Sequence, residues 1–264
     1  MSAAAITVDV PAPRRTRHWV ALWWALSRKN FQVRYKRASL GMMWVVIQPT
    51  LQALVVAFVF QRVFRITGTD RYPAFVLAGM LPWAYFAQGV NAATTAIVEN
   101  SALVKKVAVP LLLFPLASVG GIALTFMASL VVMLVVGVVN GHLGPVYLLL
   151  PAVVLQSLLI GGLGALTCSF NVAYRDVRYA VESALVIGFY ATPVFYTLDR
   201  LPPGARRLLR FNPMDGILSL YRAAILDRPV DGAAVAWSIG ITTAFLVVGL
   251  AAFRWRSREF ADLV

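Results

Sequence analysis

The chain has 264 residues, of which 60% are hydrophobic and only 13% are charged, and its mean hydropathy is +0.75. Because soluble globular proteins carry about 25% charged residues, this composition excludes a soluble enzyme and indicates an integral membrane protein. The basic residues behind the net charge of +13 lie beside apolar segments, so they fit membrane orientation and anionic lipid better than nucleic acid.

The N-terminal region is basic and leads directly into an apolar segment. We expect residues 1–17, rich in Ala, Pro and Arg, to form a disordered cytoplasmic tail, since they lack the apolar core of a signal peptide. Residues 18–40 predict an amphipathic helix, with tryptophans on one side and Arg28, Lys29 and Lys36 on the other. This pattern is typical of an interface helix lying in the membrane surface.

Residues 41–264 form the predicted transmembrane domain. Six segments are long enough to cross a bilayer as helices of ~20 residues: they lie within residues 41–61, 72–98, 107–139, 144–172, 179–196 and 233–253. Pro82 is expected to break the second segment. Since a helix satisfies its own backbone hydrogen bonds in lipid, the predicted fold class is an all-α integral membrane protein with six transmembrane helices.

Small residues gather within the fourth segment. Gly161, Gly162 and Gly164 lie in an apolar run, where they allow neighbouring helices to approach closely. Cys168 follows as a small buried residue that, being the single cysteine, cannot form an intramolecular disulfide. We therefore expect a tight helix interface here and not a phosphate-binding loop.

The connection between the fifth and sixth segments contains two short predicted helices. Residues 205–211 form a basic turn or two after a Pro-Pro-Gly sequence, and residues 214–226 follow the break at Asn212-Pro213. Neither is long enough to span the membrane, so we expect re-entrant helices before the last span. An ordinary surface loop is the alternative.

The distribution of Lys and Arg predicts the orientation. With the N-terminus inside, 15 of the 24 basic residues, including every lysine, fall on the inner side. The other 9 fall outside, many of them in the basic connection 199–228. This bias favours a multi-pass protein with both termini in the cytoplasm.

Residues that would carry catalysis or proton transport are missing from the predicted spans. No acidic residue lies in the middle of a span, since Glu182 is near an inner end, and His18 and His142 fall outside. The sequence has no Gly-Lys pair and therefore no Walker-type nucleotide loop. It also has no metal-ligand cluster. We predict no catalytic, cofactor-binding or metal-binding residue, and hence no enzymatic activity, in this chain.

Several stretches in order resemble the ABC-2-type transporter permeases that export lipid-linked polysaccharides such as O-antigen and teichoic acid. The matching stretches are residues 34–44 with Gln48-Pro49, the loop 99–110, Tyr174-Arg175-Asp176, Thr192-Pro193-Val194-Phe195-Tyr196 and Asn212-Pro213. In the loop 99–110 the family usually has Phe before the proline, where this chain has Val109. The resemblance runs from about residue 20 to the C-terminus.

This resemblance implies the membrane subunit of an ATP-driven exporter of polyprenyl-pyrophosphate-linked polysaccharide across the bacterial cytoplasmic (inner) membrane, as in lipopolysaccharide biosynthesis. It also implies a homodimer with two copies of a separate ATPase subunit, which binds ATP and Mg²⁺. The alternatives are a drug or small-lipid exporter permease of the same superfamily, a membrane enzyme acting on polyprenyl phosphates, and a structural scaffold.

Three groups of residues are the candidate sites. Aromatic residues could line the substrate path or only anchor helices in an interfacial belt: they are Trp44, Trp83, Tyr85, Phe86, Tyr190, Phe195 and Tyr196, with Gln48, Gln52, Gln88 and Asn91 as polar partners. Basic residues of the interface helix could bind a lipid pyrophosphate or anionic phospholipid generally: they are Arg34, Lys36 and Arg37. Charged residues of two inner loops are expected to couple to the ATPase: they are Glu99, Lys105, Lys106, Arg175 and Asp176.

Overall fold

A computed structural model describes residues 12–35, 43–59, 72–105, 109–141, 143–198, 202–257 and Phe260. Within these residues the chain consists of helices joined by turns, with no strand, which confirms the predicted all-α fold class. The elements are α1 (Ala12–Tyr35), α2 (Trp44–Phe58), α3 (Tyr72–Glu99), α4 (Ser101–Val104), α5 (Leu113–Val139), the 3-10 turn η3 (Val146–Leu148), α6 (Leu149–Ala173), α7 (Val177–Ala191), α8 (Pro203–Leu209), α9 (Pro213–Leu226) and α10 (Gly232–Arg256).

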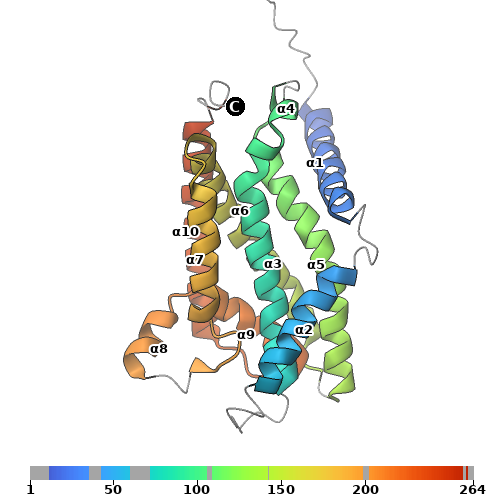
Figure 1. The fold of residues 1–264 in the computed structure, drawn as a ribbon, viewed down its shortest axis with the longest axis vertical. Coiled ribbons are helices and arrows are strands. Elements are labelled where there is room, and N and C mark those ends of the chain that lie inside the picture. The colour runs from blue at the N-terminus through green and yellow to red at the C-terminus, as the bar shows by residue number, and fades with distance from the viewer. Residues whose placement is uncertain are drawn as a thin grey trace, which may run out of the picture.

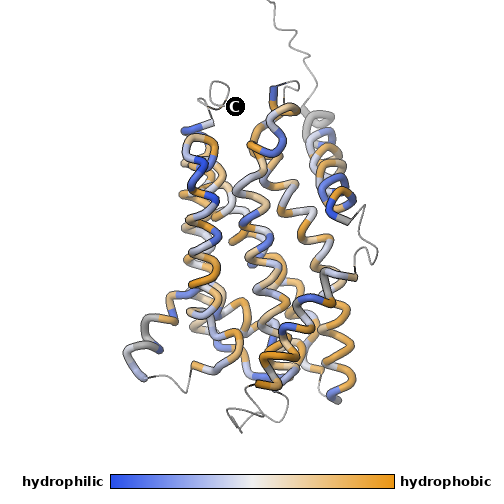
Figure 2. Tube along the Cα trace, viewed as in Figure 1, coloured by the Kyte–Doolittle hydropathy of each residue, from blue (hydrophilic) through white to orange (hydrophobic). Residues whose placement is uncertain are grey.

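Three segments of the described chain are long and apolar enough to cross a membrane: Leu113–Val139, Val146–Ala173 and Gly232–Arg256. Figure 2 shows α5 hydrophobic along most of its length, whereas α1 alternates between hydrophilic and hydrophobic residues. Helix α3 is as long but less apolar. Helices α2 and α7 have 15 residues each, or ~22 Å at ~1.5 Å per residue, which is shorter than a hydrocarbon core of ~30 Å.

The helices form a bundle around α3, which packs against α2, α5 and α6, while α10 packs along α6. In Figure 1, α4 and the C-terminal end of α10 lie at one end of the bundle, and α8 and α9 lie at the other. We call these the α4 end and the α9 end. Helix α7 begins at the α4 end and runs to the α9 end. Helix α1 lies beside α5 near the α4 end, and α2 lies nearer the α9 end.

Close contacts between helices occur where the small residues of α6 face their neighbours. A Cβ atom on Gly249 of α10 would collide with the carbonyl of Gly162, and one on Gly164 would collide with Ala93 of α3. The predicted packing role is therefore confirmed for Gly162 and Gly164, whereas a Cβ atom on Gly161 would make only an ordinary contact with Leu116 at 3.7 Å. Cys168 is also fully buried.

The expected break at Pro82 is absent, because α3 continues through this residue. Proline lacks the N–H that would bond to the carbonyl one turn earlier, but surrounding helices can compensate for such a loss. The missing N–H would have bonded to the Ala78 carbonyl. Gln156 of α6 donates to a different carbonyl, that of Pro82, at 2.7 Å, and this bond ties the middle of α3 to its neighbour.

Two helix starts follow from local sequence. The side chain of Asn212 accepts a hydrogen bond from the Met214 N–H at 2.9 Å, and Pro213 occupies the first turn of α9. Asp231 accepts from the Ala234 N–H at 3.0 Å at the start of α10. Both are favoured N-cap arrangements, so the short helix expected over residues 214–226 forms nearly as predicted.

The boundary of the N-terminal helix differs from the prediction. Helix α1 begins at Ala12, so residues 12–17 are helical and do not belong to the expected tail. Residues 1–11 and 36–42, which include the end of the predicted interface helix, lie outside the described residues.

Candidate functional site

A groove with a volume of about 460 Å³ lies between α2, α3 and α7, and some of the residues predicted to line the substrate path line it. This aromatic groove brings together Trp83 and Tyr190 with the polar Gln52 and Asn91. Its other lining residues were not predicted for this role: Met80, Ala84, Ala87, Glu182, Leu185, Val186 and Phe189. Sugar rings present both C–H faces and hydroxyls, so aromatic faces beside amides suit them.

The two predicted aromatic residues of this groove are held differently. Trp83 is 8% exposed, and its ring centroid lies 5.3 Å from that of Phe86 and 5.9 Å from that of Phe189. Tyr190 is 64% exposed. Trp83 therefore forms part of the wall, whereas Tyr190 is accessible from outside the chain.

Other predicted path residues lie outside the aromatic groove. Tyr85 is buried, its ring stacks on Phe126 with centroids 4.5 Å apart, and its hydroxyl lies 2.8 Å from the Ser157 hydroxyl. Phe86 is also buried, and Trp44 is exposed on the first turn of α2. The structure thus places Tyr85 in the core between α3, α5 and α6.

Phe195 and Tyr196 lie just beyond α7, in the turn of residues 192–196. The Tyr196 hydroxyl donates to the Tyr190 carbonyl at 3.0 Å, and the Phe195 ring lies 5.8 Å from that of Phe189. The Tyr72 hydroxyl of α3 donates to the Phe195 carbonyl at 2.6 Å. These contacts place both residues beside the end of the aromatic groove.

The same turn is held by two side chains that the sequence analysis did not assign to a site. Asn212 donates to the Thr192 hydroxyl at 2.8 Å. Arg222 of α9 donates to the carbonyls of Pro193 at 2.6 Å and Val194 at 2.9 Å. The charge count placed Arg222 on the outer side of the membrane, within the short helix predicted over residues 214–226, and the structure shows that it is only 8% exposed.

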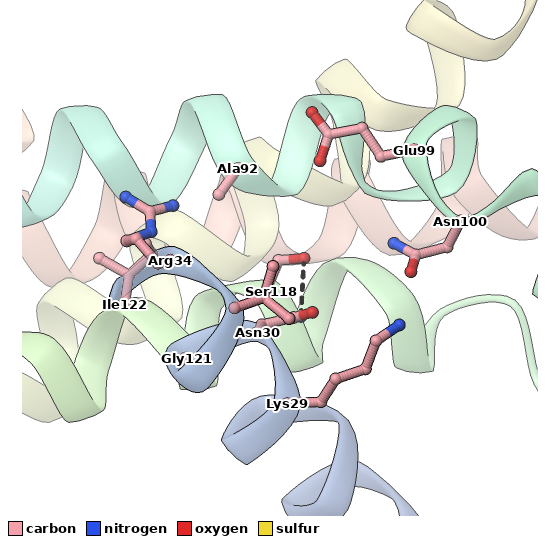
Figure 3. Close-up of a pocket in the computed structure, with 10 residues that line it drawn as sticks. Lys29, Asn30, Arg34, Ala92, Glu99, Asn100, Ser118, Gly121 and Ile122 are labelled. Atoms are coloured by element: carbon pink, nitrogen blue, oxygen red, sulfur yellow. Dashed lines mark hydrogen bonds between the residues drawn. The ribbon is translucent and has the colours of Figure 1, made fainter. Parts of the chain in front are cut away.

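A second cavity, the polar pocket, lies between α1, α3 and α5 and has a volume of about 360 Å³ (Figure 3). It is lined by Lys29, Asn30, Val33, Arg34, Ala92, Glu99, Asn100, Ser118, Gly121 and Ile122. Arg34 donates to the Gln88 side-chain oxygen at 3.2 Å, and the Asn30 amide lies 3.5 Å from the Ser118 hydroxyl. The predicted head-group residue Arg34 and the predicted coupling residue Glu99 therefore line the same pocket.

Two glycines of α5 allow α1 to form this pocket. A Cβ atom on Gly120 would lie 2.8 Å from the Trp23 ring and would also collide with Ser27, and one on Gly121 would lie 3.1 Å from the Ser27 carbonyl. The Trp23 indole donates to the Leu116 carbonyl at 3.0 Å. This close approach presents the polar face of α1 to the end of α3.

The remaining predicted charges lie at the α4 end or outside the described chain. Lys105 directly follows α4, and Arg175 and Asp176 form the turn between α6 and α7, all three exposed. Lys36, Arg37 and Lys106 lie outside the described residues.

The chain has relatives that match it over nearly its full length. It is 29% identical to the O-antigen export system permease protein RfbA of Myxococcus xanthus over 245 residues, covering 91% of this chain and 94% of the relative. It is 25% identical to RfbA of Klebsiella pneumoniae over 242 residues, covering 90% and 93%. It is 22% identical to the polysialic acid transport protein KpsM of Escherichia coli over 237 residues, covering 88% and 92%.

Residues 21–226 match the ABC-2 type transporter family. This match begins within α1 and extends to the end of α9. It therefore includes the helices around the aromatic groove (α2, α3 and α7) and those around the polar pocket (α1, α3 and α5). Because it covers more than half of the chain, the chain belongs to the ABC-2 type transporter family.

Proposed function

We propose that this chain is the membrane subunit of an ATP-driven exporter that moves a lipid-linked polysaccharide outward across the bacterial cytoplasmic membrane. The observation that carries the proposal is the similarity to O-antigen and polysialic acid export proteins over about nine-tenths of the chain. These names favour polysaccharide over the alternatives of a drug or a small lipid, and over a membrane enzyme.

In this proposal the six spans contain α2, α3, α5, α6, α7 and α10, of which α2 and α7 form only part of their spans; α8 and α9 are re-entrant, and both termini are cytoplasmic. Helix α4, the start of α7 and the end of α10 share one end of the bundle, opposite α8 and α9, as this topology requires. In a Cys168→Ala background, we expect a cysteine at Ser101 to react with a membrane-impermeant reagent from the cytoplasmic side. A cysteine at Gly204 should react from outside, and the reverse pattern would contradict the topology.

The polymer passes along the aromatic groove, which a second copy of the chain closes. A hydrated polymer needs partners for its hydroxyls, since each unpaired hydroxyl in hydrocarbon costs several kcal/mol. The groove offers Gln52 and Asn91 beside the rings of Trp83 and Tyr190. Beside it, Leu51 and Leu54 of α2 and Ile187 of α7 are exposed, and they would pack against lipid or the second copy.

ATP and Mg²⁺ bind to two copies of a separate ATPase subunit, which docks at the α4 end. The exposed charges of Lys105, Arg175 and Asp176 at this end support that contact. Arg34, together with Lys36 and Arg37, attracts the pyrophosphate of the lipid carrier from the same side.

Export by groove variants tests the proposal. In cells whose own copy of the gene is deleted, the wild-type chain should restore surface polysaccharide, and Tyr190→Ala should restore much less at equal protein abundance, since the sugar loses a flat ring. Tyr190→Phe keeps the ring and serves as the matched control. Surface polysaccharide that tracks protein abundance in every variant would refute the path. Deletion without any loss of surface polysaccharide would refute the substrate class.

A further inference from the structure

The polar pocket contains charged groups that form no ion pair with another described residue. The ion pair found among the described residues joins Arg178 to Glu182 of α7, so no described residue forms an ion pair with Lys29 or Glu99. Arg34 bonds to the neutral amide of Gln88, which leaves other N–H groups of its guanidinium available as donors. Two cations and one carboxylate therefore line a single cavity of about 360 Å³ with unused bonding capacity.

These charges come from different walls of the pocket. Helix α1 contributes Lys29 and Arg34, whereas Glu99 is the last residue of α3 and Asn100 follows it directly (Figure 3). The Asn100 amide nitrogen donates to the Ala96 carbonyl at 2.8 Å, so the side-chain oxygen of Asn100 is the atom left to accept. One wall thus donates to anions, and the other accepts from hydroxyl or ammonium groups.

The small residues on the pocket walls leave room for a ligand. Ala92 of α3 and Gly121 of α5 line it, and α1 already approaches Gly121 so closely that a Cβ atom there would lie 3.1 Å from the Asn30 Cβ. The resulting volume lies within the range of about 300–1,000 Å³ that is usual for small-ligand sites.

We propose that the polar pocket binds a sugar phosphate, with the phosphate beside Arg34 and the sugar hydroxyls donating to Glu99 and Asn100. A bare phosphate would use one wall and be repelled by the Glu99 carboxylate, and a neutral sugar would leave the Arg34 cation unused. This inference rests on the proposed function, since a lipid-linked polysaccharide has such a group where its carrier joins the first sugar. The pocket therefore recognises that junction and not the phosphate alone.

The experiment compares two probes that differ by one sugar: farnesyl pyrophosphate and the same molecule carrying one glucose. Dissociation constants are measured by calorimetry for the full-length chain in phosphatidylcholine nanodiscs. Nucleotide is left out, so that any role of Glu99 in ATPase coupling cannot contribute. We expect the glucosylated probe to bind about tenfold more tightly, because hydrogen bonds to a charged acceptor are among the strong ones.

Variants separate the two walls. Glu99→Ala should remove the preference for the glucosylated probe, and Arg34→Gln should weaken both probes by a similar factor of about ten, since it removes a charge-assisted contact. Arg254→Gln, which removes an exposed arginine outside the pocket, is the matched control and should bind both probes as the wild type does. Thermal unfolding of each variant verifies that the fold is intact.

Equal affinity of the wild type for both probes, or a sugar preference that survives Glu99→Ala, would overturn the inference. The proposed function has its own readout in the surface polysaccharide of the deletion strain. Export that depends on the chain together with equal probe affinities would refute sugar recognition in the pocket and leave the exporter assignment intact.

Discussion

The two ends of α7 are held very differently. At the α9 end, Asn212 and Arg222 bind the turn that follows the helix, and Arg222 also stacks on Phe75 with its guanidinium 3.8 Å from the ring centroid. Toward the α4 end, the hydrogen bond from Arg178 to Glu182 stays within the surface of α7 itself. Within α7, whose residues are all described, Leu185 is the only buried residue.

A cavity also lies on each side of α7. The aromatic groove lies on one side, and an apolar cavity of about 330 Å³ lies on the other, where Leu159, Leu163 and Phe245 contribute to its lining. Because packing, and not helix propensity, supplies most of the stability of a helix, the position of α7 depends chiefly on its contacts at the α9 end.

The largest effect on stability is expected from Arg222→Met, which removes both hydrogen bonds from Arg222 to the turn that follows α7. The carbonyls of Pro193 and Val194 would lose their donor while buried, and each such loss costs about 1–3 kcal/mol. We expect the free energy of unfolding to fall by on the order of 3 kcal/mol, measured by denaturant titration in detergent.

Arg210→Met is the matched control for this substitution, since Arg210 directly follows α8, two residues before Asn212, and is exposed. It should unfold as the wild type does. If Arg222→Met were as stable as Arg210→Met, the two ends of α7 would not differ in the way described.

Asn212→Ala should have a smaller effect that sharpens the comparison. This change removes both the N-cap of α9 and the bond to the Thr192 hydroxyl, for an expected loss of about 2 kcal/mol. Asp231→Ala removes only an N-cap, that of α10, and should cost about 1 kcal/mol. Equal losses in the two variants would show that the bond to Thr192 contributes nothing to stability.

The smallest effect is expected at the other end of the helix. Glu182→Gln breaks the ion pair between Arg178 and Glu182. The Arg178 side chain is 53% exposed and the Glu182 side chain is 44% exposed. Such solvent-exposed pairs within a helix contribute about 0.3–0.5 kcal/mol, so the unfolding midpoint should hardly move. A loss comparable to that of Arg222→Met would mean that α7 is anchored at both ends.

Much of the helical framework followed from the sequence alone, because long apolar runs and local breaks are local properties. The runs 107–139, 144–172 and 233–253 contain or nearly coincide with α5, α6 and α10, and Asn212-Pro213 marks the start of α9. Two of the glycines of α6 were also predictable as packing residues, since small residues in an apolar run have few other roles.

Tertiary structure decided which face of each helix meets which neighbour. Trp83 and Tyr85 are two positions apart and were indistinguishable as aromatic path candidates, yet one lines the aromatic groove and the other stacks on Phe126 in the core. From the sequence, Arg222 was one of the basic residues on the outer side, and only the packing of α9 into the bundle shows that it is buried. Glu99 was a charge of an inner loop, and only the packing of α1 shows that it lines the polar pocket. Helical periodicity fixes only the angle between side chains on one helix, whereas their environment depends on helices that are distant in sequence, which only packing brings together.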